Sequence, residues 1–241
     1  MNAIKKLWML VLLLSVPAMA IASGAGVHLD KAPGKLGDQA SLQRGAKFFV
    51  ANCLACHSAA YMRYNRLMDI GIAESEIKGM LPDGSKLGST MKATMDAEAA
   101  KQAYGVPPPD LSVIARARGV DWLYTYLRGF YLDSTRASGV NNVVFPGVGM
   151  PNIFAGMQGD QELHVATHDG HETRTLKLIS PGSMTTEQFN ATVADLVNYL
   201  DFMSDPSKLV RYNIGYVVLG FLFVLLALTY ALKKEYWKDI H

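Results

Sequence analysis

Cysteine and charged residues are both scarce in this sequence. Only 2 of the 241 residues are cysteine, which excludes a disulfide-rich scaffold and makes the spacing of the two informative. Charged residues make up 18%, the formal net charge is +2, and no cluster of Lys and Arg gives the chain an electrostatic footprint for nucleic acid. Because 50% of the residues are hydrophobic, the composition excludes a disordered chain and fits one domain with attachments.

The N-terminus has the three parts of a secretory signal. Lys5 and Lys6 precede the apolar stretch Leu7–Val16, and small residues then offer a cleavage site after Ala20 or Ala22. An apolar core of this length is too short to span ~30 Å of hydrocarbon, so we expect cleavage rather than a permanent anchor. The segment lacks the Arg and Ser enrichment of an organelle transit peptide, which indicates bacterial export.

The C-terminal region predicts a transmembrane helix. Asn213–Leu232 contains no charged residue and would form a helix ~30 Å long, with aromatic residues near both ends. Lys233, Lys234 and Lys238 follow it, so the positive-inside rule places the C-terminus in the cytoplasm. The predicted organisation is a signal peptide (1–22), a periplasmic domain (23–210), a transmembrane helix (211–232) and a cytoplasmic tail (233–241). The transmembrane helix is expected to cross the inner membrane once, in contact with its lipid.

The two cysteines lie in the sequence Cys53-Leu54-Ala55-Cys56-His57, which is the C-x-x-C-H attachment motif of c-type haem. Two thiols at this spacing can form thioethers with the two vinyl groups of one porphyrin, and His57 can then supply an axial nitrogen to iron. A thioredoxin-like dithiol needs no histidine, a zinc site needs two further ligands, and a simple disulfide explains neither His57 nor the export. We therefore predict one covalently attached haem c.

Two amphipathic helices are predicted on either side of this region. The first covers Ser41–Val50, with Asp38 or Ser41 as its N-cap, and delivers the cysteines at its end. The second covers Thr186–Met203, with a capping box formed by Thr185 and Gln188. An N-terminal helix crossing a C-terminal helix over a haem resembles the class I cytochrome c fold. The expected fold is mainly α, a haem domain of this kind with loop insertions, a small hairpin and the C-terminal membrane helix.

The second axial ligand decides between an electron carrier and a haem with an open site. Met150 lies in a loop with two prolines and several glycines, and Met184 lies in a weaker version of the same setting, so both remain candidates. The rigid stretch Pro107-Pro108-Pro109 predicts a fixed wall against the cofactor, to which Pro109 belongs. An arginine in Arg116-Ala117-Arg118 could bind a haem propionate, or could be a solvated helix residue.

Together these motifs resemble the cytochrome c1 family. The resemblance rests on residues 53–57 (CLACH), 64–67 (YNRL), 108–112 (PPDLS), 116–118 (RAR), 145–147 (FPG) and 149–151 (GMP), and on the single C-terminal anchor. It implies that Met150 is the axial ligand and that Arg118 binds a propionate. It also implies a subunit without a catalytic site of its own in a dimeric ubiquinol–cytochrome c reductase (cytochrome bc1) complex, with cytochrome b and a Rieske iron–sulfur protein as partners and a cytochrome c as electron acceptor.

Two alternatives and two departures from the family accompany this interpretation. The chain could be an anchored carrier of another respiratory complex or, with an open iron site, a haem peroxidase. The domain lacks the dense acidic run with which some members dock a basic cytochrome c. The segment Leu163–Leu178 is longer than expected and predicts a hairpin with a type I′ turn at Asp169-Gly170. His164, His168 and His171 on it fit a polar surface hairpin better than a metal site.

Overall fold

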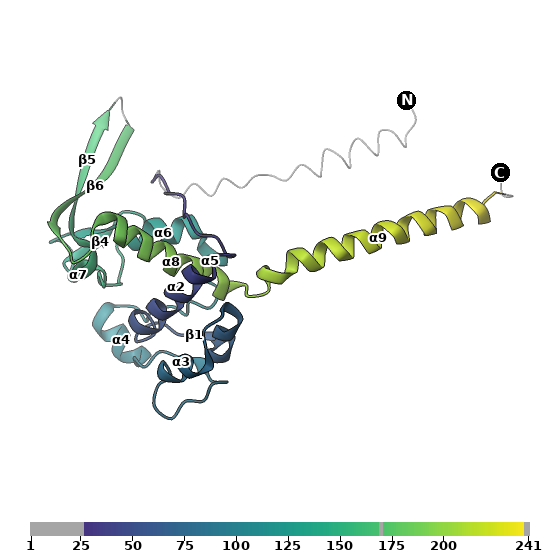
Figure 1. Ribbon diagram of the computed structural model, residues 1–241. Helices are drawn as coiled ribbons and strands as arrows, with labels where there is room; N and C mark the ends of the chain where they lie inside the picture. Colours follow the sequence, from purple (N-terminus) through teal and green to yellow (C-terminus); the bar gives the residue numbers. More distant parts are fainter. Residues whose placement is uncertain (1–26, 169–170, 239–241) are drawn as a thin grey trace.

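The computed structural model describes residues 27–168 and 171–238. The predicted signal peptide, the tip of the predicted hairpin at Asp169-Gly170 and the last three residues of the predicted tail lie outside the described residues. Within the described part, a mainly α-helical head carries one long helix that extends away from it (Figure 1). The mainly α class predicted from the sequence is thereby confirmed.

The described elements are helices of very different lengths and three two-stranded sheets. In chain order they are α2 (Gln39–Asn52), β1 (Ala59–Arg63), η1 (Tyr64–Ile70), α3 (Glu74–Gly79), β2 (Thr90–Met91), α4 (Ala97–Tyr104), α5 (Ile114–Arg118), α6 (Val120–Arg128), β3 (Phe130–Leu132), β4 (Val140–Asn142), α7 (Ala155–Gln158), β5 (Gly159–His168), β6 (His171–Pro181), α8 (Thr186–Ser204) and α9 (Lys208–Tyr236).

The packing of α2 against α8 forms the centre of the head. Phe49 of α2 and Tyr199 of α8 are both fully buried, with ring centroids 5.6 Å apart. Gly45 lets the two backbones come close, because a Cβ atom at this position would overlap the carbonyl oxygen of Asp195. The guanidinium of Arg44 donates two hydrogen bonds, of 2.6 and 2.9 Å, to the Asp195 carboxylate across the same contact. These contacts fix the direction in which α2 delivers the residues that follow it.

The caps of these two helices follow the sequence prediction. Of the two candidate caps of α2, Asp38 is the N-cap, and its Oδ1 accepts a hydrogen bond from the Ser41 backbone N–H. Thr185 and Gln188 form the predicted capping box at the start of α8. Helix α2 extends two residues beyond the predicted range at each end, whereas α8 begins where predicted and ends one residue later.

The hairpin of β5 and β6 is longer than the predicted segment 163–178. Its strands pair antiparallel from Gly159 with Pro181 to His168 with His171, and it projects from the head (Figure 1). The other two sheets, β1 with β2 and β3 with β4, have strands of two to five residues. The extra length arises at the base, where β5 also lies against β3.

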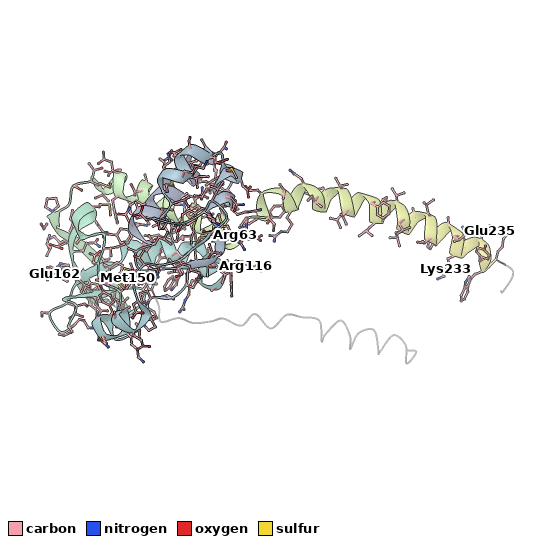
Figure 2. All side chains as sticks on the ribbon, turned by 90° about the horizontal axis from the view of Figure 1, so that it is seen from below. Arg63, Arg116, Met150, Glu162, Lys233 and Glu235 are labelled. Carbon is pink, nitrogen blue, oxygen red and sulfur yellow. The ribbon has the colours of Figure 1, made fainter. Side chains whose placement is uncertain are left out.

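Helix α9 contains the whole predicted membrane segment 211–232. It has 29 residues. Its most apolar stretch of 18 residues has a mean hydropathy of 2.3, and none of these residues is buried against the head. Figure 2 shows Lys233 and Glu235 near the end of this helix that is far from the head, while Met150 lies within the head. A core helix of a soluble protein would be buried, so the exposure of α9 fits a helix that crosses a bilayer.

The close approach at Gly45 leads to a stability prediction. Gly45→Ala should lower the free energy of unfolding by about 2–3 kcal/mol, because the new methyl group forces α2 away from the α8 backbone. Gly79→Ala is the matched control, since Gly79 ends α3 and a Cβ there meets nothing within 4 Å. Urea unfolding of the full chain in detergent, followed by circular dichroism, measures both. Equal stability of the two variants would contradict the packing described here.

Candidate functional site

Two adjoining cavities form a single cleft beside the C-x-x-C-H motif. Their volumes are about 230 and 80 Å³, and their linings share seven residues: Cys53, His57, Val106, Pro109, Gly149, Met150 and Ile153. We call this combined space the motif cleft. It brings together residues from the end of α2, from the segment before α5 and from the loop after β4, which lie far apart in the sequence. All six residues predicted to bind the cofactor line one or both cavities.

Helix α2 places both thiols in the motif cleft. Cys53 is the C-cap of the helix, and the backbone N–H groups of Cys56 and His57 donate hydrogen bonds to its carbonyl oxygen. Both thiols are free, with Cys53 buried and Cys56 half-buried. Burial, with a smaller contribution from Cys56, raises the pKa of the Cys53 thiol to about 12. A zinc ligand or a redox nucleophile needs a thiolate, whereas a thioether is neutral and suits this burial.

The His57 imidazole is oriented by a backbone carbonyl. Its Nδ1 lies 2.8 Å from the Pro109 oxygen, which can only accept, so Nδ1 carries the proton and Nε2 keeps a free lone pair. Burial lowers the pKa of His57, although the Pro109 bond and the Asp110 charge oppose the shift, and this favours the neutral ring that a metal requires. Pro109 thus contributes a carbonyl as well as the predicted wall.

Asp110 holds the proline segment in place against the first sheet. Its carboxylate accepts hydrogen bonds from the backbone N–H groups of Ala60, at 2.9 Å, and Ser112, at 2.8 Å. The Leu111 N–H donates to the Ser58 carbonyl oxygen nearby. These bonds attach the acceptor of the His57 proton to the same strand that follows the motif, so the imidazole and its acceptor move together.

Of the two candidate methionines, only Met150 lines the motif cleft. Its Sδ accepts a hydrogen bond of 3.4 Å from the Tyr126 hydroxyl, which projects from α6 into the same space. The sulfur of Met184 instead lies 3.8 Å from the Thr192 hydroxyl of α8, and Met184 is absent from the described lining of the cleft. Burial raises the pKa of Tyr126 to about 12, so its hydroxyl remains a neutral donor.

Sequence reasoning missed the aromatic wall that α6 provides. Trp122 and Tyr126 stack with ring centroids 4.8 Å apart, and both line the cleft. Their spacing of four residues on a helix was the available signal, but nothing local shows that this face meets a sulfur 24 residues away.

Arg118, the last residue of α5, lies at the aromatic edge of the motif cleft. Its guanidinium carbon is 5.2 Å from the centroid of the Trp122 ring and 5.9 Å from that of Phe145. Within the described part of the chain, no carboxylate pairs with Arg118. Its hydrogen-bond donors are therefore available to a carboxylate bound in the cleft. Arg116, the other arginine of the motif, does not line the cleft.

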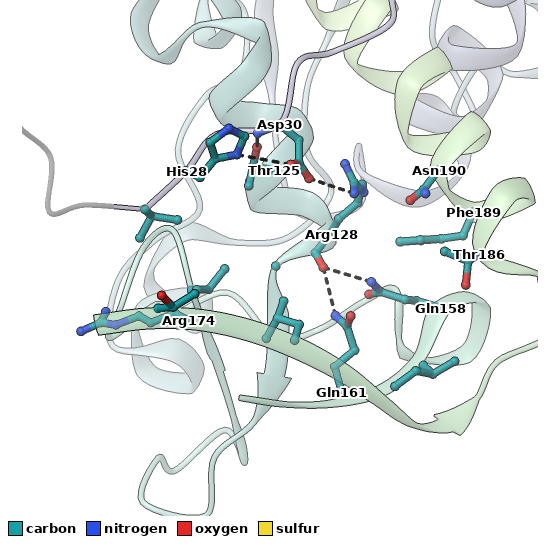
Figure 3. Close-up of a pocket in the computed structure, with 16 residues that line it drawn as sticks. His28, Asp30, Thr125, Arg128, Gln158, Gln161, Arg174, Thr186, Phe189 and Asn190 are labelled. Carbon is teal, nitrogen blue, oxygen red and sulfur yellow. Dashed lines mark hydrogen bonds and ion pairs between the residues drawn. The ribbon is translucent and has the colours of Figure 1, made fainter. Parts of the chain in front are cut away.

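A larger recess of about 620 Å³ lies elsewhere on the head and shares no residue with the motif cleft (Figure 3). Arg128 pairs with Asp30 at 3.0 Å there, while the side-chain amides of Gln158 and Gln161 donate to the Arg128 carbonyl oxygen. The described lining of this recess contains no sulfur atom. Its chemistry does not match a c-type haem, despite its greater size.

The residues of the motif cleft fit a c-type haem. They provide two thiols for attachment, an imidazole Nε2 and a thioether sulfur as the two kinds of axial ligand found in cytochromes c, and apolar and aromatic walls. The Arg118 guanidinium at the edge of the cleft can bind a haem propionate. A zinc site or a redox dithiol would not combine two thiols, an imidazole and a thioether in this way.

Comparison with known proteins gives the same result. The cytochrome C1 family matches residues 30–86 and 83–240. A protein named cytochrome c1 from Allochromatium vinosum is 46% identical over 98% of this chain and 100% of its own length. One named ammonia monooxygenase gamma subunit from Nitrosomonas europaea is 49% identical over 97% of this chain and 98% of its own length.

The name of a third relative combines two cytochromes. The cytochrome b/c1 protein of Bradyrhizobium diazoefficiens is 26% identical over 85% of this chain, which corresponds to 34% of the longer relative. The family match spans nearly all of the described head and the long helix, including every residue of the motif cleft. The chain therefore belongs to the cytochrome c1 family, the c-type cytochromes of the bc1 complex that act in electron transfer.

Proposed function

We propose that this chain carries one haem c, attached to Cys53 and Cys56 by thioethers, with His57 Nε2 and Met150 Sδ as the axial ligands of iron. We further propose that it passes single electrons from a Rieske iron–sulfur protein to a cytochrome c, within a dimeric complex that contains cytochrome b. The observation that carries this proposal is the convergence of a prepared imidazole and a thioether sulfur on one apolar cleft.

The bound haem would supply a one-electron couple, and the chain's residues set the conditions for it. The Pro109 carbonyl holds the His57 ring in one tautomer and orientation. A thioether ligand favours the reduced state, and burial disfavours the additional charge of the oxidised state. Arg118 is positioned to bind a propionate at the aromatic edge. None of these groups is required to make or break a bond in a substrate.

The membrane arrangement is part of the same proposal. Helix α9 would anchor the head to the bacterial inner membrane, with the head in the periplasm and residues 233–241 in the cytoplasm. The support is the uncharged stretch of α9, followed by Lys233 and Lys234 in its last turn. Export through a cleaved signal peptide at residues 1–22 agrees with this orientation, because haem is attached to such motifs outside the bacterial cytoplasm.

A second candidate function is electron transfer in a different membrane complex. It is favoured by the 49% identical relative, whose name is that of a monooxygenase subunit. The motif cleft would serve an electron carrier in either complex. Purification of the tagged chain in mild detergent distinguishes the two: cytochrome b and a Rieske protein as copurifying subunits support the first, and monooxygenase subunits without them support the second.

A haem peroxidase has less support than either carrier. Such an enzyme needs an open iron position with acid–base groups beside it. Among the described residues that line the motif cleft, His57 is the sole imidazole, and Met150 adds a thioether to the same lining.

Replacement of the sulfur ligand tests the axial assignment. Met150→Leu should lower the reduction potential by on the order of 0.2 V, since axial ligands set potentials over about 0.8 V, and should let the reduced protein bind carbon monoxide. Met184→Leu is the matched control, because this methionine lies outside the cleft. Redox titration and absorption spectroscopy of the holoprotein measure both effects. If the reduction potential falls in the Met184 variant alone, Met184 rather than Met150 is the axial ligand.

The Tyr126 hydroxyl should tune the potential through the same sulfur. A hydrogen bond withdraws electron density from Sδ and so favours the reduced state; Tyr126→Phe should therefore lower the potential by roughly 20–40 mV, the size expected for part of one hydrogen bond. Tyr124→Phe on the same helix is the control, because Tyr124 stacks on Arg128 outside the cleft. Equal potentials in the two variants would show that the hydroxyl does not act on the ligand.

A further inference from the structure

The loop that delivers Met150 is held by side chains rather than by regular secondary structure. It comprises residues 143–149, directly after β4, and forms no helix or strand. Its single proline, Pro146, supplies no backbone donor, and its two glycines, Gly147 and Gly149, add conformational freedom. Most of its backbone N–H groups therefore need acceptors from outside the loop.

Asn142, at the end of β4, provides one acceptor atom for two of these N–H groups. It is fully buried, and its Oδ1 accepts hydrogen bonds from the backbone N–H groups of Val144, at 2.9 Å, and Phe145, at 3.2 Å. Its Nδ2 donates at 2.8 Å to the carbonyl oxygen of Tyr126 in α6. One amide group thus connects the loop to the helix that lines the motif cleft.

The sulfur of Met150 contacts the same residue of α6 as Asn142 does, so the loop is attached to Tyr126 at both of its ends. Tyr126 accepts from Asn142 through its carbonyl oxygen, and its hydroxyl donates to Met150 Sδ at 3.4 Å. The loop leads from Asn142 to Met150 along the chain, so both of its ends are attached to the same helical residue. Any slackening at Asn142 lets the sulfur end of the loop move away from the cleft.

Asn141 forms a second attachment on the outer side of the loop. Its Oδ1 accepts from the Gly147 N–H at 2.8 Å, and its Nδ2 donates to Asp133 Oδ2 at 2.8 Å. Arg136 donates to the Gly147 carbonyl oxygen at 3.1 Å. Gly147 has φ +80°, a left-handed conformation that these bonds stabilise.

We propose that Asn142 is a positioning residue that holds Met150 against the iron, with Asn141 as its auxiliary. The inference rests on the proposed function, in which Met150 is the axial ligand. Removal of the Asn142 amide leaves the Val144 and Phe145 N–H groups without the oxygen that accepts from them, and leaves the Tyr126 carbonyl bonded to the Gly129 N–H. The loop then leaves its native position more often, and the iron is exposed to external ligands for a larger fraction of the time.

A buried asparagine elsewhere in the head provides a matched control. Asn198 of α8 is also buried, and its Nδ2 donates to the Lys35 carbonyl oxygen and the Ser41 hydroxyl, both at 3.0 Å. It connects α8 to the N-terminal side of α2 and makes no contact with the Met150 loop. Asn142→Ala and Asn198→Ala therefore remove similar buried amides, but only the first acts on the ligand.

The experiment uses the full-length holoprotein in detergent and carbon monoxide as the probe. Asn142→Ala should raise the rate of carbon monoxide binding to the reduced protein at least about tenfold and lower the reduction potential. Asn198→Ala should leave both within about twofold of the wild type, although both variants unfold at lower temperature. Amide hydrogen exchange at Val144 and Gly147 should become faster in Asn142→Ala alone.

The outcomes separate this inference from the axial assignment when Met150→Leu is measured in parallel. If Met150→Leu binds carbon monoxide but Asn142→Ala behaves as Asn198→Ala does, the positioning role is wrong and the axial assignment stands. If Met150→Leu binds no carbon monoxide, both are wrong. Should Asn142→Ala fail to accumulate, Asn141→Ala removes the oxygen that accepts from the Gly147 and Asn142 backbone N–H groups and leaves the Asn142 side chain in place. A several-fold faster binding supports the inference, and an unchanged rate overturns it.

Discussion

The proposed haem iron needs a rigid support for each of its two ligands, and the head has a separate supporting structure beside each proposed ligand, His57 and Met150. On the imidazole side, the close packing of α2 and α8 at Gly45 fixes where the motif begins. The Pro109 carbonyl then fixes the His57 ring, and Asp110 fixes the proline segment. Together these contacts connect the packed helix α2 to the His57 ring and fix the direction of its Nε2 atom.

The thioether side is built differently, because Met150 lies on a loop. Helix α6 supplies the support here. One of its faces carries Trp122 and Tyr126 into the motif cleft, and the Tyr126 carbonyl oxygen accepts a hydrogen bond from the Asn142 side chain. The proposed sulfur ligand is thus supported by hydrogen bonds from the side chains of Asn142 and Tyr126, whereas the His57 imidazole is held by the Pro109 carbonyl. Burial raises the pKa of Cys53 and lowers the pKa of His57, so both groups are neutral, and Arg118 is the one charged side chain in the described lining of the cleft.

Local signals in the sequence predicted the parts of this arrangement that depend on neighbouring residues. The capping box at Thr185, the apolar periodicity of α8 and the spacing of the C-x-x-C-H motif are such signals, and each helix formed where it was expected. The Pro109 carbonyl and the Tyr126 hydroxyl were not predictable, because each meets its partner only after distant segments have packed. The same holds for the longer base of the β5–β6 hairpin, which depends on its contact with β3.

The central claim is that one porphyrin is joined covalently to the two thiols of this cleft. The most direct test is the intact mass of the mature chain, purified from its membrane and extracted with acidic acetone, which removes haem that is not covalently bound. The account predicts that the chain keeps its colour and has the mass of the polypeptide plus one haem. A colourless polypeptide with two unmodified cysteines would contradict it.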